Sequence, residues 1–310
     1  MNVRKIVAIS LGLVVLYTAI CFGYARYSRP KVAEKSKQLE KRVSTFSAQD
    51  PQLAFAITPE KLKELNDIFN QPFYFVGQGK QCTAYGSRDG KYVIKFVLQK
   101  PLVVKERFLR LPDFYPFTLI KSYKVNKYEV RKKSLYKAFM LSYQAIPEQT
   151  GTLFVHLNTT QELFIRPLLF DPQGCPVHID VNKTQFVVQK RAHHIKPAIM
   201  ELMWDGKENE AKSRIDQMFS LLYECAKKQI IDVDDGLIRN NNIGFLEQRA
   251  IYIDTGKLRK KNGPLTKAAF VKDLKRLAPF HRWLQTYYPN LALHFEAQQR
   301  KMVREFENSG

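Results

Sequence analysis

The 310-residue chain has few cysteines and few glycines, 4 and 14 respectively. The cysteines are scattered, and no two of them have the spacing of a zinc finger or of a redox pair. This excludes a disulfide framework, and free thiols favour a reducing compartment for the main domain. There is no internal repeat, no low-complexity tract and no Gly-x-Ser-x-Gly elbow, so repeat architectures and that class of hydrolase are excluded as well.

Acidic residues are also scarce, since 29 Asp and Glu face 50 Lys and Arg and leave a formal net charge of +21. A surplus of this size indicates a polyanionic neighbour, which could be nucleic acid, an anionic membrane surface or a phosphorylated ligand. Hydrophobic residues make up 45% of the chain and aromatic residues 12%, which predicts a folded protein of one large or two small domains.

Long apolar runs are absent except at residues 6–25, which follow a short basic start and carry no charge. About 20 residues can cross a bilayer as a helix, whereas the apolar centre of a signal peptide usually has about 7–15 residues. We therefore expect a transmembrane anchor over residues 1–25, with a cleaved signal peptide as the alternative. More positive charge follows the run than precedes it, so the positive-inside rule places the main domain of this single-pass membrane protein in the cytoplasm.

Beyond the anchor, the sequence divides into three parts. Residues 26–58 are polar and basic and predict a juxtamembrane linker whose cations lie against anionic headgroups. Strand patterns prevail over residues 59–191 and helical patterns over residues 192–310. The order predicts an α+β protein with two lobes, the first rich in strands and the second in helices.

Local signals place several elements within these lobes. Thr58 followed by proline predicts the start of a helix, and Asp89-Gly90 between apolar runs predicts a hairpin turn. Apolar spacing predicts a helix over residues 116–145 and another around residues 211–230. The face of the second should carry Ile215, Phe219, Leu222 and Cys225.

Two of four motifs with potential chemistry lie in the strand-rich part. The first is a turn with Gly77 and Gly79, where backbone N–H groups could approach a phosphate. The second is Lys95 in the apolar strand "YVIKF". Strand alternation would point this lysine to solvent, whereas a nucleotide site would need it to point inward at phosphates.

The other two motifs lie in the helix-rich part. The loop over residues 232–242 is crowded with Asp232, Asp234, Asp235, Asn240, Asn241 and Asn242. Their oxygens suit a hard cation such as Mg²⁺, although Asp and Asn also favour ordinary turns. One predicted hairpin later comes Asp254-Thr255-Gly256, which is again either a turn or a metal ligand above a phosphate.

In this order the four motifs resemble the protein-kinase-like superfamily, over roughly residues 72–300. Its glycine loop and Val-Ala-Ile-Lys strand would correspond to Gly77–Gly79 and Lys95, and its catalytic loop and Asp-Phe-Gly to residues 232–242 and Asp254-Thr255-Gly256. The resemblance implies ATP and Mg²⁺ as cofactors and phosphate transfer to an unknown hydroxyl acceptor. The resemblance also implies that the predicted α+β protein has the two-lobed fold of protein kinases.

The resemblance also implies roles. Lys95 would bind the α- and β-phosphates, and Asp254 and Asn242 would hold Mg²⁺. Asp234 or Asp235 would take the proton of the acceptor hydroxyl. Two registers of this loop remain open, because Asp235 and Asn240 have the family spacing whereas Asn242 lies directly before a predicted strand, as the family asparagine does.

Departures from the family pattern point to a divergent kinase or a catalytically inactive pseudokinase. Thr255 replaces the phenylalanine, Cys82 stands near the third loop glycine, and neither His-Arg nor Ala-Pro-Glu is present. The helix glutamate that should pair with Lys95 is assigned to Glu129, with Glu148 a poorer candidate.

Two further clusters give alternatives. Cys175, His178, His193 and His194 match no standard zinc spacing and are interpreted as surface or hinge residues. The stretch "KSYKVNKYEVRKKSLYK" interleaves tyrosines with cations, which could bind nucleic acid. Because an anchor is expected nearby, an anionic bilayer is the simpler partner and nucleic acid is not expected.

Overall fold

The computed structural model describes Val43 and residues 57–99, 106–233, 242–263 and 266–308. The expected anchor over residues 1–25 and most of the linker over residues 26–58 lie outside this set. Among the residues that are described, no helix has both the length and the apolar character needed to cross a bilayer. Val43 departs from the linker interpretation, because it is buried, bridges Leu98 and packs in the core of the sheet.

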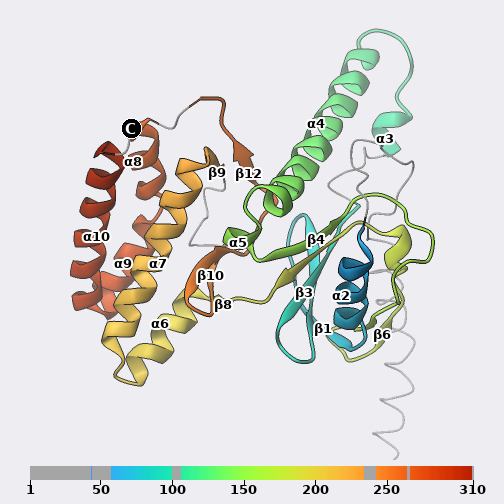
Figure 1. The fold of residues 1–310 in the computed structure, drawn as a ribbon. Coiled ribbons are helices and arrows are strands. Elements are labelled where there is room, and N and C mark those ends of the chain that lie inside the picture. The colour runs from blue at the N-terminus through green and yellow to red at the C-terminus, as the bar shows by residue number, and fades with distance from the viewer. Residues whose placement is uncertain (1–42, 44–56, 100–105, 234–241, 264–265, 309–310) are drawn as a thin grey trace, which may run out of the picture.

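A seven-stranded sheet forms one half of the protein (Figure 1). Its strands follow the order β4-β7-β3-β2-β1-β5-β6, and β5 is parallel to β1. Gly90 has φ +73°, the left-handed conformation that the predicted Asp89-Gly90 turn requires. The strands are β1 Pro72–Gln78, β2 Cys82–Ser87, β3 Tyr92–Val97, β4 Thr152–His156, β5 Leu168–Phe170, β6 Pro176–Val177 and β7 Phe186–Lys190.

Helix α2, Pro59–Phe69, packs against this sheet and begins where the sequence predicts. The side chain of Thr58 accepts a hydrogen bond from the Lys61 amide at 3.3 Å, which caps the helix. Leu65 and Phe69 enter a core that Phe73, Phe154 and Phe186 share, among others.

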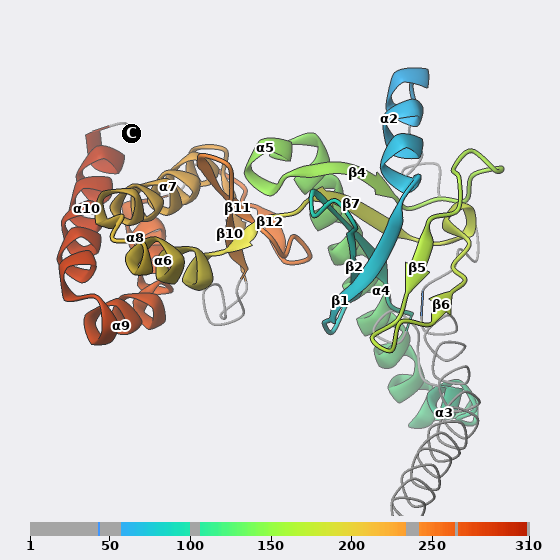
Figure 2. The same cartoon turned by 90° about the horizontal axis from the view of Figure 1, so that it is seen from below.

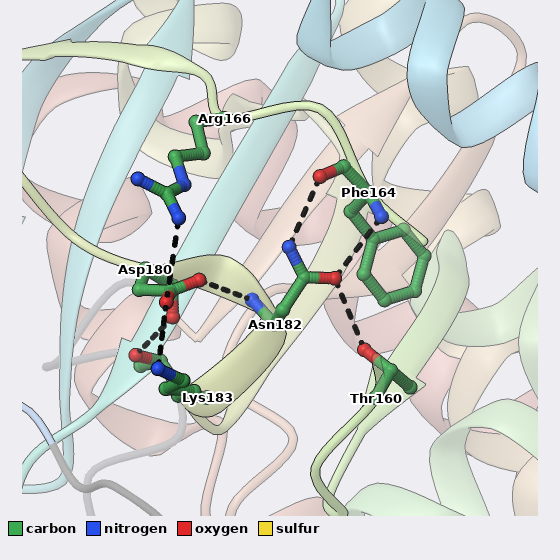
Figure 3. A network of polar contacts seen from close by, with 7 residues as sticks. Thr160, Phe164, Arg166, Asp180, Asn182 and Lys183 are labelled. Carbon is green, nitrogen blue, oxygen red and sulfur yellow. Dashed lines mark hydrogen bonds and ion pairs between the residues drawn. The ribbon is translucent and has the colours of Figure 1, made fainter. Parts of the chain in front are cut away.

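A network of polar contacts surrounds the buried side chain of Asn182 (Figure 3). The Asn182 side-chain oxygen accepts from the Phe164 amide at 3.1 Å and from the Thr160 hydroxyl at 3.2 Å. Its amide nitrogen donates to the Phe164 carbonyl at 3.1 Å. One buried side chain thus satisfies both backbone groups of Phe164. It lies on the short 3-10 helix η2, Val181–Lys183.

Helix α4, Phe117–Gln144, confirms the helix predicted over residues 116–145. Only its C-terminal part is packed, with Leu135, Phe139 and Ser142 among the buried residues. Two short helices flank it, α3 Glu106–Leu109 and α5 Pro147–Thr150. Its N-terminal part projects beyond the sheet (Figures 1 and 2).

The other half of the protein is helical and has its own core (Figure 2). All four residues predicted to share a face of the second helix are buried on α7, which confirms that prediction. The helices are α6 Ile195–Trp204, α7 Glu208–Lys227, α8 Lys267–Lys275, α9 Ala278–Tyr287 and α10 Pro289–Asn308.

Short strands lie between the sheet and the helices (Figure 2). The hairpin of β10 and β11 was predicted. The pairing of β9 with β12 was not predicted, and Asp232, which was interpreted as a loop residue, is the last residue of β9. These strands are β8 His193–His194, β9 Ile230–Asp232, β10 Ile243–Leu246, β11 Arg249–Tyr252 and β12 Leu258–Lys260. A mixed α+β architecture with a large sheet is confirmed.

Candidate functional site

Lys95 lies in the middle of the sheet, on β3 between β2 and β7. Its amine does not point to solvent. It donates a hydrogen bond of 2.5 Å to the carbonyl of Ile253, 158 positions further along the chain. Burial lowers the pKa of Lys95, and the nearby Asp254 carboxylate opposes that effect. The inward orientation that a nucleotide site needs is therefore the one observed.

Asp254 follows Ile253 directly, so the Lys95 amine and the Asp254 carboxylate lie close together. The Asp254 Oδ1 atom accepts from the amide of Gly256 at 3.0 Å, which forms a tight turn through Thr255. Its second carboxylate oxygen has no hydrogen-bond partner in the described part of the chain. Thr255 is 2% exposed and thus belongs to the core.

Asn242 lies across the β10–β11 hairpin from Ile253. The carbonyl of Asn242 accepts from the Ile253 amide at 2.7 Å, which extends the pairing of Ile243 with Tyr252 by one position. Asn242 is 4% exposed. The hairpin thus brings Asn242 and Asp254 to the same end, beside the Lys95 amine.

Of the two glycines that were predicted to lie in one turn, only Gly79 does so. Gly77 is a strand residue at the irregularity of β1, whereas Gly79 lies in the turn and donates its amide to the Cys82 carbonyl at 2.9 Å. A side chain at Gly77 would meet nothing within 4 Å, and one at Gly79 only the Cys82 carbonyl at 3.8 Å. Among the described residues, the turn therefore leaves room beside both glycines.

The same turn reaches the segment that carries Asp254. Gln81 follows Gly79 by two residues, and its side-chain oxygen occupies the place of a β-carbon at Gly256. Leu135 of α4 lies against the same place at 3.1 Å. Only glycine fits at position 256 without moving one of these neighbours.

Cys82 shares this environment with Lys95 and Asp254. Burial raises the pKa of the Cys82 thiol to about 12; Lys95 acts to lower it and Asp254 to raise it further. The thiol is therefore protonated at neutral pH, and neither nucleophilic nor redox chemistry is expected of it.

Asp234 and Asp235, the predicted catalytic bases, lie outside the described residues. The described residues on either side of them, Val233 and Asn242, both pair with the segment that contains Asp254. The Val233 amide donates to the Lys257 carbonyl at 3.2 Å, and Asn242 is paired with Ile253.

The structure does not place Glu129 beside Lys95. Glu129 is exposed on α4, and no ion pair joins it to Lys95. The buried face of α4 is centred on Leu135 and Phe139. Glu129 comes seven residues before the buried Tyr136 and so shares its helix face, but it belongs to the N-terminal part of α4, in which no residue is buried. Glu148 lies 3.5 Å from Arg249 at the rim of the hairpin.

The donor set suits a hard cation bound together with phosphates. Asp254 and Asn242 supply one carboxylate and one amide oxygen, and Mg²⁺ is usually held by one or two carboxylates with phosphate and water oxygens completing the shell. No cluster of three or more His, Cys, Asp or Glu within the described ranges could hold a metal alone. That includes the histidines and Cys175 considered above.

Two surface hollows lie elsewhere. One, of about 530 Å³, is lined by Glu64, Asp67 and Asp89 among others, and a second, of about 280 Å³, by Arg166 and His178 among others. Neither includes Lys95, Asn242 or Asp254, so the candidate site rests on the convergence of these residues and not on a cavity.

Comparison with known proteins gives weak likenesses in structure alone. No family model matches the chain, and no curated protein matches it in sequence. One similar structure is that of the bifunctional kinase-methyltransferase WbdD, with a TM-score of 0.32, 15% identity and 72% of this chain covered. Another is the ternary complex of APH(2")-IIa with streptomycin and ATP, with a TM-score of 0.28, 10% identity and 81% of this chain covered.

The shares of the neighbours that are covered differ. The match spans 43% of the WbdD chain and 99% of the APH(2")-IIa chain.

Proposed function

We propose that this protein binds ATP with Mg²⁺ next to Lys95 and transfers phosphate to a hydroxyl acceptor. The supporting observation is the hydrogen bond from the Lys95 amine to the Ile253 carbonyl, at 2.5 Å. The bond joins Lys95, which is expected to bind phosphate, to Ile253. Ile253 directly precedes Asp254 and pairs with Asn242 across the hairpin, and these two residues are the expected metal ligands. Packing alone does not require three such polar groups from distant segments to meet.

Lys95 would hold the α- and β-phosphates. An ammonium group has three N–H donors, and Ile253 takes one of them. The remaining two are available to phosphate oxygens. The Asp254 carboxylate acts to raise the pKa of Lys95 and so favours its charged form, whereas burial acts to lower that pKa.

Asp254 and Asn242 would hold Mg²⁺, which when bound neutralises charge that develops on the transferred phosphoryl group. The Gly256 amide donates to one oxygen of Asp254, and the other oxygen would bind the cation. Gly77 and Gly79 would let the β1–β2 turn approach the phosphates. Asp234 or Asp235 would accept the proton of the acceptor hydroxyl.

Residues 6–25 would anchor the protein in a membrane, with the main domain in the cytoplasm. The proposal of a nucleotide site does not depend on this anchor. Digestion of the domain by protease added outside intact cells would contradict the orientation.

Nucleotide binding by the full-length chain tests the proposal. Mg²⁺ and ATP together should raise its melting temperature, and Asp254→Asn or Lys95→Met should each weaken binding about tenfold or more, as expected for loss of a bond to a charged group. Asp205→Asn and Lys63→Met, both exposed and distant, are matched controls. A folded wild-type sample that shows no Mg²⁺-dependent shift with ATP or GTP contradicts the proposal.

A second function, nucleotide binding without turnover, is favoured by one observation. Lys95 has no glutamate partner from α4 in this structure, although active kinases require that ion pair. A pseudokinase would bind ATP without releasing or transferring its terminal phosphate. If such a protein acts as an interaction module and not through its nucleotide, Asp254→Asn and Lys95→Met would leave its cellular activity intact, whereas an active kinase would lose it.

A further inference from the structure

The N-terminal part of α4 extends away from the rest of the protein. All buried residues of the helix lie between Leu135 and Ser142. Residues 117–134 include none, and at 1.5 Å per residue they form an arm of about 27 Å. Figures 1 and 2 show this part of α4 projecting beyond the sheet, with α3 beside its tip. We refer to residues 108–134 as the α4 arm.

The α4 arm carries an unusual share of exposed apolar surface. Eight of the eighteen large hydrophobic residues that are exposed in the described chain belong to it. They are Leu109, Phe114, Tyr115, Leu119, Ile120, Tyr123, Val125 and Val130. Single exposed apolar residues are normal, but their concentration on one projecting element marks an interaction surface.

Three of these residues form a stripe along the helix. Leu119, Tyr123 and Val130 are separated by four and seven residues, which places them on one face. These residues lie about 120–160° round the helix from Leu135, so the stripe points away from the sheet. The stripe therefore contributes nothing to the core of the part of the chain that the structure describes.

Cations accompany the stripe. Helix α4 has seven basic residues and a single acidic one, Glu129. The other carboxylate of the arm, Asp113, is paired with Lys121 at 2.7 Å. Lys124 lies 4.9 Å from the ring centre of Phe108, and Arg131 lies 5.6 Å from that of Tyr128. Long cationic side chains thus extend over apolar surface and keep their charged ends in water.

We propose that the α4 arm docks on an anionic lipid surface. Aromatic and aliphatic groups beside cations are the composition of helices that lie in the headgroup region of a bilayer, where apolar burial and attraction to anionic lipid act together. Phosphates of a nucleic acid would meet the cations equally well. However, they would leave Leu119, Ile120 and Val130 in water, because aliphatic side chains neither stack on bases nor contact phosphate.

Amide hydrogen exchange of the full-length chain in lipid nanodiscs tests this inference. The discs contain phosphatidylcholine, with or without phosphatidylserine, and the readout is exchange within residues 117–131. Every sample contains the same residues 6–25, so any insertion of this segment into the disc is common to all the exchange rates that are compared. Exchange should be about tenfold slower or more in the anionic discs at low salt and should speed up as salt is added.

Three variants make the test specific. Lys124→Gln, Lys127→Gln and Arg131→Gln together should return exchange to its rate in neutral discs, since each cation near an anionic surface is worth about fivefold in binding. Lys272→Gln, Lys275→Gln and Arg300→Gln remove the same charge from exposed positions on α8 and α10 and should change nothing. Leu119→Ser with Val130→Ser should weaken protection at every salt concentration. Unchanged exchange in α7 serves as the check that each variant is folded.

Two results would overturn the inference. One is equal exchange of residues 117–131 in neutral and anionic discs. The other is that an RNA duplex, without lipid, slows exchange of residues 117–131 as much as the anionic discs do, and that Leu119→Ser with Val130→Ser does not change this effect. Failure here leaves the nucleotide site untouched, because the arm and the Lys95 site share no residue.

Discussion

Gln81 and Gly256 are in contact across the candidate site, because the side-chain oxygen of Gln81 occupies the space that a β-carbon at Gly256 would need. The contact holds the turn between β1 and β2 against the segment of Asp254.

Gly256→Ala should displace the Gln81 side chain and cost about 1 kcal/mol of unfolding free energy. The cost is moderate because the flexible end of Gln81 can move, while Leu135 at 3.1 Å has to shift by a few tenths of an ångström. Gln81→Ala in the same chain should recover most of the loss. Chemical denaturation of the single and double variants measures this coupling, and strictly additive losses would contradict the contact.

His156 should make the protein less stable in mild acid. It is buried among the rings of Phe154, Phe164 and Phe186, and its Nδ1 atom lies 2.8 Å from the Thr184 carbonyl. Burial lowers the pKa of His156 from 6.5 to about 4, against the opposing effect of Thr184. The unfolded chain binds the proton first. Stability from this group is therefore complete above pH 6.5 and falls by about 3 kcal/mol as the pH drops to about 4.

Two measurements check the His156 prediction. Denaturation across this pH range should show a shallower acid dependence in His156→Gln than in the wild type, whereas His193→Gln, at an exposed position, should keep the wild-type dependence. In the wild type, the ring resonances of His156 should not titrate above pH 5. A His156 that titrates near 6.5 in the folded protein would refute the argument.

Asn182→Ala should be among the more costly substitutions in the sheet half, at about 3 kcal/mol. The change removes three hydrogen bonds and leaves both backbone groups of Phe164 without that partner (Figure 3). Arg166→Ala is the control, since Arg166 lies 3.8 Å from Asp180 with most of its side chain in water. Its loss should cost less than about 1 kcal/mol. Equal effects of the two variants in urea denaturation would contradict this account.

Local signals in the sequence predicted much of the fold. The Thr58 cap, the Asp89-Gly90 turn and the apolar face of α7 depend on neighbouring residues, so one segment suffices to find them. The β9–β12 pair escaped prediction because each strand has three residues and its partner lies more than twenty positions away. Strands this short show no alternation that could be recognised.

The candidate site was predicted in part. The meeting of Lys95, Asn242 and Asp254 was expected from the order of the motifs, while their roles remain predictions. Glu129 was assigned from its place in the predicted helix, but it lies in the N-terminal part of α4, which carries no buried residue, and so it is exposed. The strand position of Gly77 depends on pairing with β2, which no single segment reveals.

The sheet and the site are completed at different moments of synthesis. All seven strands of the large sheet lie within residues 72–190, so the sheet can fold on the ribosome as soon as that part has emerged. Lys95 is then already in place, but Ile253 has not yet been made. A chain truncated after β7 should therefore fold its sheet and leave Lys95 without its carbonyl partner, so the candidate site can assemble only after β11 has been made.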